Sequence, residues 1–245
     1  MNPSPIPLAA DVEAGLRRLR LATIRRQAPD VLATAKAQRW TPEELLRVLI
    51  EAEITARDES NTRNRMTLAR FPIDKTLDEF RLDESSIPRA SNDYLITLEW
   101  IHNAENLCLV GPAGTGKTHY LIGLGRAAVT AGYKVRYFTA IELVEHLYRA
   151  VADNTVGKAI ETVCRNDLII IDEIGFAPLD HTGCQLLFRL VAAGYEHRSI
   201  AIGSHSPFND WGRFLPDQPT AVSLLDRLCH HAHIITTKGT QTVIA

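Results

Sequence analysis

Short apolar runs alternate with amphipathic segments from about residue 106 to the end of the chain. Uninterrupted runs such as Leu168-Ile-Ile-Ile171 are typical of strands buried on both faces of a parallel sheet. Strands are expected at 107–110, 135–138, 168–172, 199–203 and 233–237, and helices at 117–131, 140–151, 156–165, 181–195 and 220–230. Thr139 and Asp180 are natural N-caps for two of these helices. The alternation predicts an α/β fold with a five-stranded parallel sheet flanked by helices.

The first 70 residues show helical periodicity and no strand pattern. Asp11 is a candidate helix N-cap, and Thr41-Pro42-Glu43-Glu44 is a capping box with proline at the first helical position. The helix that it starts is expected to end at Phe71-Pro72. We therefore predict a small all-helical N-terminal domain (1–70), a linker with the first core helix (71–105, helix 92–101) and the α/β core (106–245).

Composition places the chain among ordinary globular proteins. With 245 residues, 45% hydrophobic content and a net charge of −2, it can bury one main core and a smaller second one. No apolar run approaches membrane-spanning length, and the proline-rich start lacks the layout of a signal peptide. Four cysteines without a CxxC pair favour reduced thiols. A cytoplasmic location is expected.

Positive charge is concentrated in the N-terminal part. Residues 1–77 contain 13 basic and 10 acidic residues, whereas residues 78–245 contain 14 basic and 19 acidic ones. Arginine clusters such as Arg17-Arg18-Leu-Arg20 are able to contact nucleic-acid phosphates. The same clusters are also compatible with a solvated helix face, so charge alone does not decide between the two.

A complete phosphate-binding loop, GxxxxGK[ST], follows the strand expected at 107–110. Glycines let backbone N–H groups surround the phosphates, the lysine adds a positive charge, and the Thr118 hydroxyl is a ligand for Mg²⁺. The helix that begins at this loop presents its positive end to the same anion. The residues expected to contact the nucleotide are Gly111, Pro112, Ala113, Gly114, Thr115, Gly116, Lys117, Thr118 and His119.

An acidic pair, Asp172-Glu173, follows the strand expected at 168–172. The carboxyl ends of parallel strands are where α/β folds place ligands. Asp172 is expected to bind Mg²⁺ together with Thr118, and Glu173 to orient or deprotonate the attacking water. Because a kinase has little use for a water-activating glutamate, the pair favours ATP hydrolysis, with Lys117, Asp172 and Glu173 as catalytic residues.

Two other readings of the phosphate loop stay open. A small-molecule kinase would need a lid with catalytic arginines and an acceptor pocket, and neither is visible in the sequence. A nucleotide-gated binding module with negligible turnover would keep the loop without efficient hydrolysis. Substitution of Glu173 by glutamine separates the readings, since only a hydrolase is expected to lose turnover while it keeps ATP binding.

The chain resembles the IstB-like ATPases, the transposition helper proteins of insertion sequences, which belong to the AAA+ class of P-loop NTPases and are similar to helicase loaders of the DnaC type. The resemblance covers nearly the whole chain. The segments that carry it are Lys75-Thr-Leu-Asp-Glu-Phe80, Gly111–Thr118, Ile169-Ile-Ile-Asp-Glu-Ile-Gly-Phe-Ala-Pro-Leu-Asp180, Pro207-Phe-Asn-Asp-Trp-Gly212 and Leu224-Leu-Asp-Arg-Leu-Cys-His-His231.

This resemblance implies an ATPase that uses ATP and Mg²⁺, forms homo-oligomers on duplex DNA and recruits or activates a partner transposase. The alternative that it implies is a helicase loader acting in replication on single strands. Arg227 lies where AAA+ proteins carry an arginine finger, which would reach the ATP site of a neighbouring subunit. Relatives usually have asparagine or a small polar residue as the γ-phosphate sensor, and this chain has Ser204-His205 at that place. Either side chain is a candidate, and His205 is included among the catalytic residues.

DNA contacts are expected on the helices between the second and third strands and in the first arginine cluster. The candidates are Arg17, Arg18, Arg20, Arg149, Lys158 and Arg165. They are expected to contact backbone phosphates with little sequence preference. His230, His231 and His233 form no recognisable zinc pattern, because adjacent histidines are expected to point apart and no cysteine or carboxylate completes the spacing.

Overall fold

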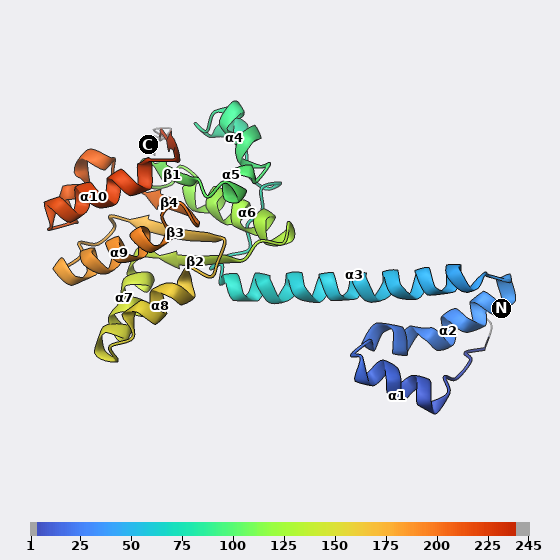
Figure 1. Ribbon diagram of the computed structural model, residues 1–245. Helices are drawn as coiled ribbons and strands as arrows, with labels where there is room; N and C mark the ends of the chain where they lie inside the picture. The colour runs from blue at the N-terminus through green and yellow to red at the C-terminus, as the bar shows by residue number, and fades with distance from the viewer. Residues whose placement is uncertain (1–3, 239–245) are drawn as a thin grey trace. The chain divides into compact units, whose positions relative to one another are not determined.

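The computed structural model describes residues 4–238 and contains two compact units, Met1–Asn64 and Arg65–Ala245 (Figure 1). The three-part division expected from the sequence stays a prediction. No helix within the described residues is long and apolar enough to cross a membrane. The helices of the N-terminal part are α1 (Ala10–Arg18), α2 (Ala22–Gln38) and α3 (Pro42–Ala69).

The N-terminal unit is held together by a buried carboxylate on α3. Glu53 Oε2 accepts hydrogen bonds from the Thr23 and Ile24 amides at 2.9 and 3.0 Å. It is therefore the acceptor for backbone N–H groups at the start of α2 that have no partner within the helix. Arg57 contacts Glu53 Oε1 at 2.9 Å and also donates to the Arg20 carbonyl. Burial alone would raise the pKa of Glu53, but these hydrogen bonds lower it overall.

One of three helix predictions outside the α/β core is confirmed, and two are wrong. The capping box at Thr41 is confirmed, with the Thr41 amide donating to Glu44 Oε2 at 2.7 Å. The N-cap at Asp11 is wrong: α1 begins at Ala10, and Asp11 lies in its first turn, where its charge still favours the helix dipole. The single helix expected at 92–101 is wrong as well, because a left-handed residue, Leu98, separates α4 (Arg89–Leu95) from α5 (Glu99–His102).

The α/β core matches the predicted pattern within two residues at each boundary. Its five strands are all parallel, in the order β2-β3-β4-β1-β5. Thr139 and Asp180 cap α7 and α9 as expected. The elements are β1 (Asn106–Val110), α6 (Lys117–Thr130), β2 (Val135–Thr139), α7 (Ala140–Ala152), α8 (Val156–Val163), β3 (Leu168–Ile174), α9 (His181–Gly194), β4 (Ser199–Ser204), α10 (Gln218–Cys229) and β5 (Ala232–Thr236), with short 3₁₀ helices at Leu82–Glu84 and Phe208–Arg213.

Alternating strand residues build one hydrophobic layer on each face of the sheet. Leu107 and Leu109 of β1 join the layer under α6, whereas Cys108 and Val110 join the layer under α7, α9 and α10 (Figure 1). Trp100 and Trp211 are fully buried, so neither ring is available to stack on a nucleic-acid base. The four cysteines are free thiols.

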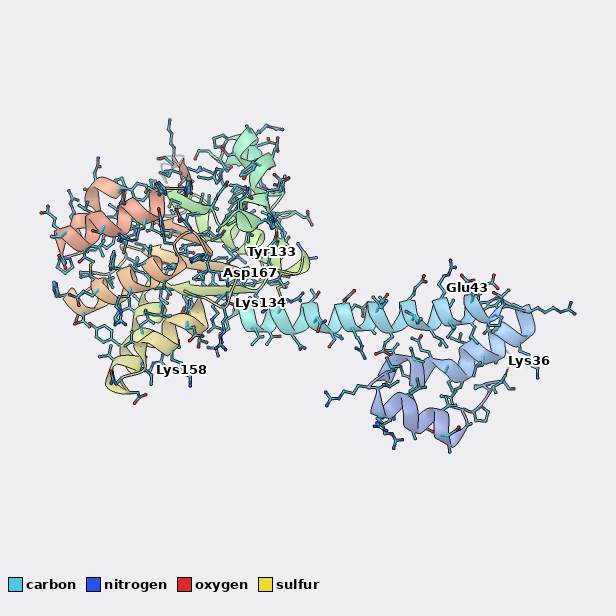
Figure 2. The ribbon with its side chains drawn as sticks, viewed as in Figure 1. Lys36, Glu43, Tyr133, Lys134, Lys158 and Asp167 are labelled. Atoms are coloured by element: carbon cyan, nitrogen blue, oxygen red, sulfur yellow. The ribbon has the colours of Figure 1, made fainter. Side chains whose placement is uncertain are left out.

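Figure 2 shows Lys134 and Asp167 where β2 and β3 begin. There the Lys134 amide donates to the Asp167 carboxylate at 2.8 Å.

Replacement of Glu53 by glutamine is expected to loosen the N-terminal unit, because the amide accepts the α2 hydrogen bonds without a charge. Loss of charge-assisted hydrogen bonds of this kind costs about 1–3 kcal/mol. Since the folded-state pKa of Glu53 is lowered, its contribution is present above the unfolded pKa of about 4.3 and is lost as the pH falls through the folded value.

Hydrogen exchange of the Thr23 and Ile24 amides measures the effect. The protection factors of these amides, which correct for the pH dependence of intrinsic exchange, are expected to fall in Glu53→Gln at pH 7, and in the unsubstituted chain only at acid pH. Glu43→Gln is the matched control, because Glu43 is an exposed α3 glutamate paired at i,i+4 with Arg47. Equal protection of the two amides in Glu53→Gln and the control would contradict the role given to Glu53.

Candidate functional site

The phosphate loop joins the carboxyl end of β1 to the amino end of α6. Gly111 follows β1 with φ +153°, and a Cβ there would lie 2.2 Å from the Thr237 carbonyl oxygen, so only glycine fits. The loop is closed from the other side by a hydrogen bond of 2.8 Å between the Thr115 and Thr237 hydroxyls. The loop therefore rests on the residue that follows β5. The sequence motif did not reveal that contact.

Lys117 begins α6 and is buried. Its Nζ donates to the carbonyl oxygens of Gly111 and Pro112, each at 2.7 Å. Burial lowers the pKa of Lys117, and the charge of Asp172 opposes that effect. The ammonium group is thus already aimed at the inside of the loop, where phosphate oxygens are able to replace the carbonyls. Thr118, one residue further along α6, is half-buried.

Asp172 is the buried carboxylate of the site, with only 2% of its surface exposed. Its Oδ2 accepts a hydrogen bond from the Tyr137 hydroxyl at 3.0 Å, and its Oδ1 accepts one from the Glu173 amide at 2.8 Å. Burial and then the charge of Asp172 raise the pKa of Tyr137, so the phenol stays a donor. The position of Asp172 is therefore fixed by hydrogen bonds from β2 and from the residue that follows it in β3.

Gly203 on β4 makes room for this carboxylate. A Cβ at that position would lie 2.0 Å from Asp172 Oδ1 and 3.0 Å from a methyl of Leu121. Sequence reasoning missed both Tyr137 and Gly203. A glycine inside an apolar strand is itself a signal of close approach, and it could have identified Gly203.

Glu173 lies in a β-bulge. Between two aligned pairs, Ile171 with Ile202 and Ile174 with Ser204, β3 contains one residue more than β4. Within this bulge Glu173 has a left-handed backbone conformation, with φ +60°. Its side chain is exposed, whereas the preceding residue, Asp172, is buried. Bulges of this kind redirect side chains beside active sites. A glutamate with such a backbone is strained by about 1–3 kcal/mol.

The two candidate γ-phosphate sensors have different surroundings. The buried Ser204 hydroxyl is hydrogen-bonded to backbone, with the Ile174 and Ser206 carbonyls at 3.1 and 2.8 Å and the Ser206 amide at 3.2 Å. His205 is exposed, its ring packs edge-on against Phe176 at 6.3 Å, and within residues 4–238 its side chain forms no hydrogen bond. His205 is thus the free donor of the two.

A cavity of about 800 Å³ opens beside the phosphate loop. Loop residues from Ala113 to Gly116 form one wall, and the linker from Lys75 to Ser86 forms the other. Phe80 packs edge-on against the His119 ring at 5.3 Å, and His119 Nε2 lies 2.9 Å from the Thr76 carbonyl. His119 therefore joins the linker to the loop. The volume is in the range of small-molecule sites.

Arg227 lies far from the loop of its own chain. The Asn106 side chain at the start of β1 donates to the carbonyl of Leu228, the residue after Arg227, at 3.1 Å. Arg227 is thus near the amino end of β1, about 16 Å along the strand from the phosphate loop. Its guanidinium lies 5.0 Å from the Phe188 ring centre and donates to the Ser223 carbonyl at 3.0 Å.

The structure brings only some of the predicted DNA contacts together. Arg149 and Lys158 border one cavity of about 360 Å³ between α7 and α8, and Lys158 lies on the outside of α8 (Figure 2). Arg165 is paired with Glu161, and Arg17 is paired with Glu13, each at i,i+4. Arg18 and Arg20 are exposed at the end of α1.

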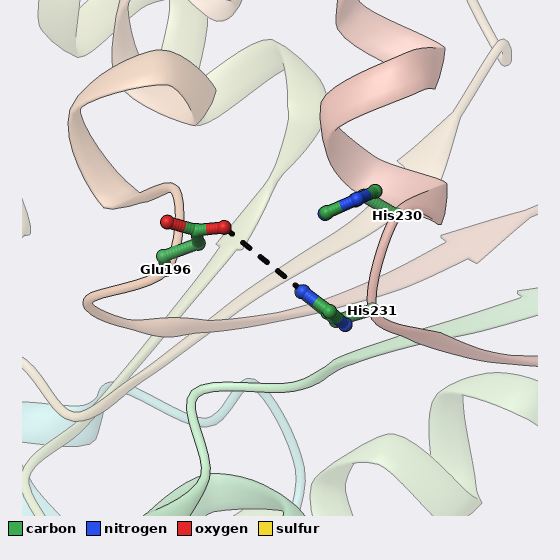
Figure 3. A group of neighbouring side chains, drawn as sticks. All are labelled: Glu196, His230 and His231. Carbon is green, nitrogen blue, oxygen red and sulfur yellow. Dashed lines mark ion pairs between the residues drawn. The ribbon is translucent and has the colours of Figure 1, made fainter.

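The histidines near the end of α10 differ from expectation. The rings of His230 and His231 do not point apart: their centres are 4.2 Å from each other, and Glu196 supplies a carboxylate 4.0 Å from His231 Nε2 (Figure 3). One ligand atom from each of the three lies within 4.8 Å of the others. The group is exposed and lies at the amino ends of β1 and β5, away from the phosphate loop.

The fold and the site define a P-loop ATP-binding protein of the AAA+ class. The IstB-like ATP-binding protein family matches residues 14–242, and the chain belongs to this family. The ATP-binding protein of insertion sequence IS5376 from Geobacillus stearothermophilus is 33% identical over 91% of this chain and 89% of its own length. That of insertion sequence IS21 from Pseudomonas aeruginosa is 32% identical over 94% and 87%.

Solved structures share the fold at low sequence identity. DnaI matches with a TM-score of 0.56 and 14% identity over 70% of this chain and 93% of its own. AMPPCP-bound DnaA from Aquifex aeolicus matches with a TM-score of 0.52 and 20% identity over 66% of this chain, which is about half (49%) of the DnaA chain. These likenesses confirm the AAA+ fold.

Replacement of Gly203 by alanine is expected to displace Asp172, because the new methyl would overlap the carboxylate. The ATP hydrolysis proposed for this site is expected to fall about 10–100-fold, the scale for displacing a metal-binding side chain. Overpacking of this size also costs about 1–3 kcal/mol of stability. Steady-state phosphate release and thermal unfolding measure the two effects. Gly194→Ala is the matched control: its Cβ would be no closer than 3.4 Å to any other group. Full turnover in Gly203→Ala would show that Asp172 does not need this space.

Proposed function

We propose that this protein is an ATP-hydrolysing, DNA-binding transposition helper, which assembles on duplex target DNA and recruits or activates a partner transposase. The observation that carries the proposal is the buried, pre-positioned Asp172 beside an exposed Glu173, with Asp172 close enough to Lys117 of the complete phosphate loop for their charges to interact. The insertion-sequence relatives supply the biological context.

Each group of the site has a proposed task. The loop amides and Lys117 bind the β- and γ-phosphates, and the adenosine occupies the cavity between loop and linker. Thr118 and Asp172 are the residues that would hold Mg²⁺, and their hydroxyl and carboxylate oxygens suit it. Mg²⁺ neutralises charge on the phosphates when bound. Glu173 orients and deprotonates the attacking water, and His205 donates a hydrogen bond to the γ-phosphate.

Arg227 is proposed to act on a neighbouring subunit. The length of β1 separates it from the phosphate loop of its own chain, so it has no route to its own ATP site. Stacking on Phe188 holds the guanidinium at the surface of α10. In a head-to-tail assembly that surface meets the ATP site of the next copy, which makes hydrolysis depend on oligomerisation. The interface chemistry is that of an arginine finger.

A helicase loader for replication is the second candidate. The fold shared with DnaI is compatible with it. A helicase loader would use the same ATPase to bind single-stranded DNA and a replicative helicase. The two functions differ in the form of DNA that the ATP-bound protein prefers. The same binding measurement therefore separates them.

Replacement of Glu173 by glutamine is expected to lower hydrolysis by about 10²–10⁴-fold while ATP binding persists, because loss of a general base removes that much catalysis. The trapped protein is expected to bind duplex DNA more tightly with ATP than with ADP, in fluorescence anisotropy with matched duplex and single strands. Glu196→Gln is the control, an exposed glutamate with a similar left-handed backbone (φ +58°) outside the ATP site. Normal turnover in Glu173→Gln would overturn the assignment, and preference for single strands would favour the helicase loader.

Replacement of Arg227 by alanine is expected to lower DNA-stimulated hydrolysis about 10³-fold, the scale of an arginine finger, without loss of ATP binding. Arg227→Lys is expected to be nearly as inactive, since an ammonium lacks the planar fork. A mixture of Arg227→Ala with Lys117→Ala is the decisive measurement. If the finger acts in trans, hydrolysis recovers in the mixture, because some interfaces contain an intact loop and an intact arginine. No recovery would contradict a finger at Arg227.

A further inference from the structure

Three arginines converge on a small cavity at the β2 edge of the sheet. The cavity has a volume of about 220 Å³. Its lining consists of the basic residues Arg70, Arg136, His146 and Arg149 together with Tyr137, Phe138 and Glu142. Arg70 follows α3, Arg136 is on β2, and the other two basic residues are on α7. All of them belong to the unit Arg65–Ala245. Distant parts of the chain thus contribute positive charge to one place.

These arginines have no acidic partner in an ion pair within residues 4–238. Arg136 donates to the Leu68 carbonyl at 2.8 Å and stacks on Phe138 with 4.8 Å to the ring centre, so its guanidinium is held in place and partly desolvated. Arg149 makes one long contact, of 3.3 Å, to the Glu145 carbonyl. The nearby Glu142 is engaged by the Thr139 amide of the α7 capping box at 2.9 Å.

The positive groups of this cavity lower one another's pKa values. Burial lowers the pKa of Arg136, and the charge of Arg70 lowers it further, while Glu142 opposes this. Burial lowers the pKa of His146, and the charges of Arg149, Arg136 and Arg70 add to the effect. Glu142, beside it on α7, and Asp153 and Lys158, across the neighbouring cavity, are the other charged groups that line its surroundings. Like charges held together without a counter-ion favour an anion between them.

We propose that this cavity, the β2-edge site, binds one phosphodiester group of the DNA backbone. Guanidinium forks match phosphate oxygens in a way that ammonium groups do not. The volume admits a phosphate but is below the roughly 300–1,000 Å³ typical of small-molecule sites, which disfavours a free nucleotide. Arg149 also borders the cavity of Lys158, so a strand held here presents its next phosphates along α7 and α8.

This inference rests on the proposed function and identifies the surface that would hold the DNA backbone. It also connects DNA to ATP hydrolysis through adjacent residues of β2. Arg136, Tyr137 and Phe138 all line the β2-edge site, and the Tyr137 hydroxyl also donates to Asp172. A shift of β2 on DNA binding would therefore reach the Mg²⁺ carboxylate through one hydrogen bond.

Arg70→Gln and Arg149→Gln test the site, because both side chains are exposed and neither supports the fold as Arg136 does. Binding to a labelled duplex and to a matched single strand is measured from 50 to 300 mM salt. Each substitution is expected to weaken binding several-fold and to reduce the slope of log K against log salt by about 0.9, the value for one phosphate contact. Arg213→Gln is the matched control, since Arg213 is exposed and paired with Asp210.

A second measurement follows the His146 imidazole by NMR in the unsubstituted protein. A phosphate in the β2-edge site is expected to raise the pKa of His146 when DNA binds. Unchanged salt slopes in both variants, with an unmoved His146, would overturn this inference and leave the proposed function intact. Absence of DNA binding by the unsubstituted protein would overturn both. The same slope losses on single strands alone would support the site and overturn the duplex preference.

Discussion

The burial of one carboxylate constrains the whole ATP site. Asp172 is nearly inaccessible to water, so its charge needs hydrogen-bond donors and a nearby cation, and the fold provides both. The Tyr137 hydroxyl donates from the neighbouring strand, and the Glu173 amide donates from the bulge. The charge of Lys117 interacts with that of Asp172. The missing side chain of Gly203 leaves the space. Four elements thus have to be in register for one oxygen pair to be in place.

The same geometry bears on the proposed arginine finger. Arg227 lies on α10 near the amino end of β1, whereas the phosphate loop follows the carboxyl end of that strand. Under the proposed function, catalysis and assembly would become one event, in which the neighbour supplies the positive charge that the single chain does not bring to its own ATP site. DNA that aligns the copies would act through the same dependence.

Sequence alone predicted the sheet, its flanking helices and the phosphate loop, because strand burial and loop chemistry are local properties. It could not predict the features that depend on contacts between distant strands. The Tyr137–Asp172 hydrogen bond joins residues 35 positions apart in the sequence. Arg70 and Arg149, which line the same cavity, are separated by a still longer stretch of the chain. The histidines show the same limit: Glu196, which completes their group, is far away in the sequence. The error at 92–101 has a local cause, a left-handed Leu98 that no propensity rule anticipates.

The left-handed backbone of Glu173 has an evolutionary consequence. Glycine or asparagine would adopt that conformation at lower cost, so selection for stability alone favours their replacement of the glutamate. Under the proposed function, the demand for turnover is what retains glutamate at this position. If hydrolysis is its proposed task, copies of such a gene that no longer need it are expected to lose this codon early, and their product would keep the fold and the nucleotide-binding loop.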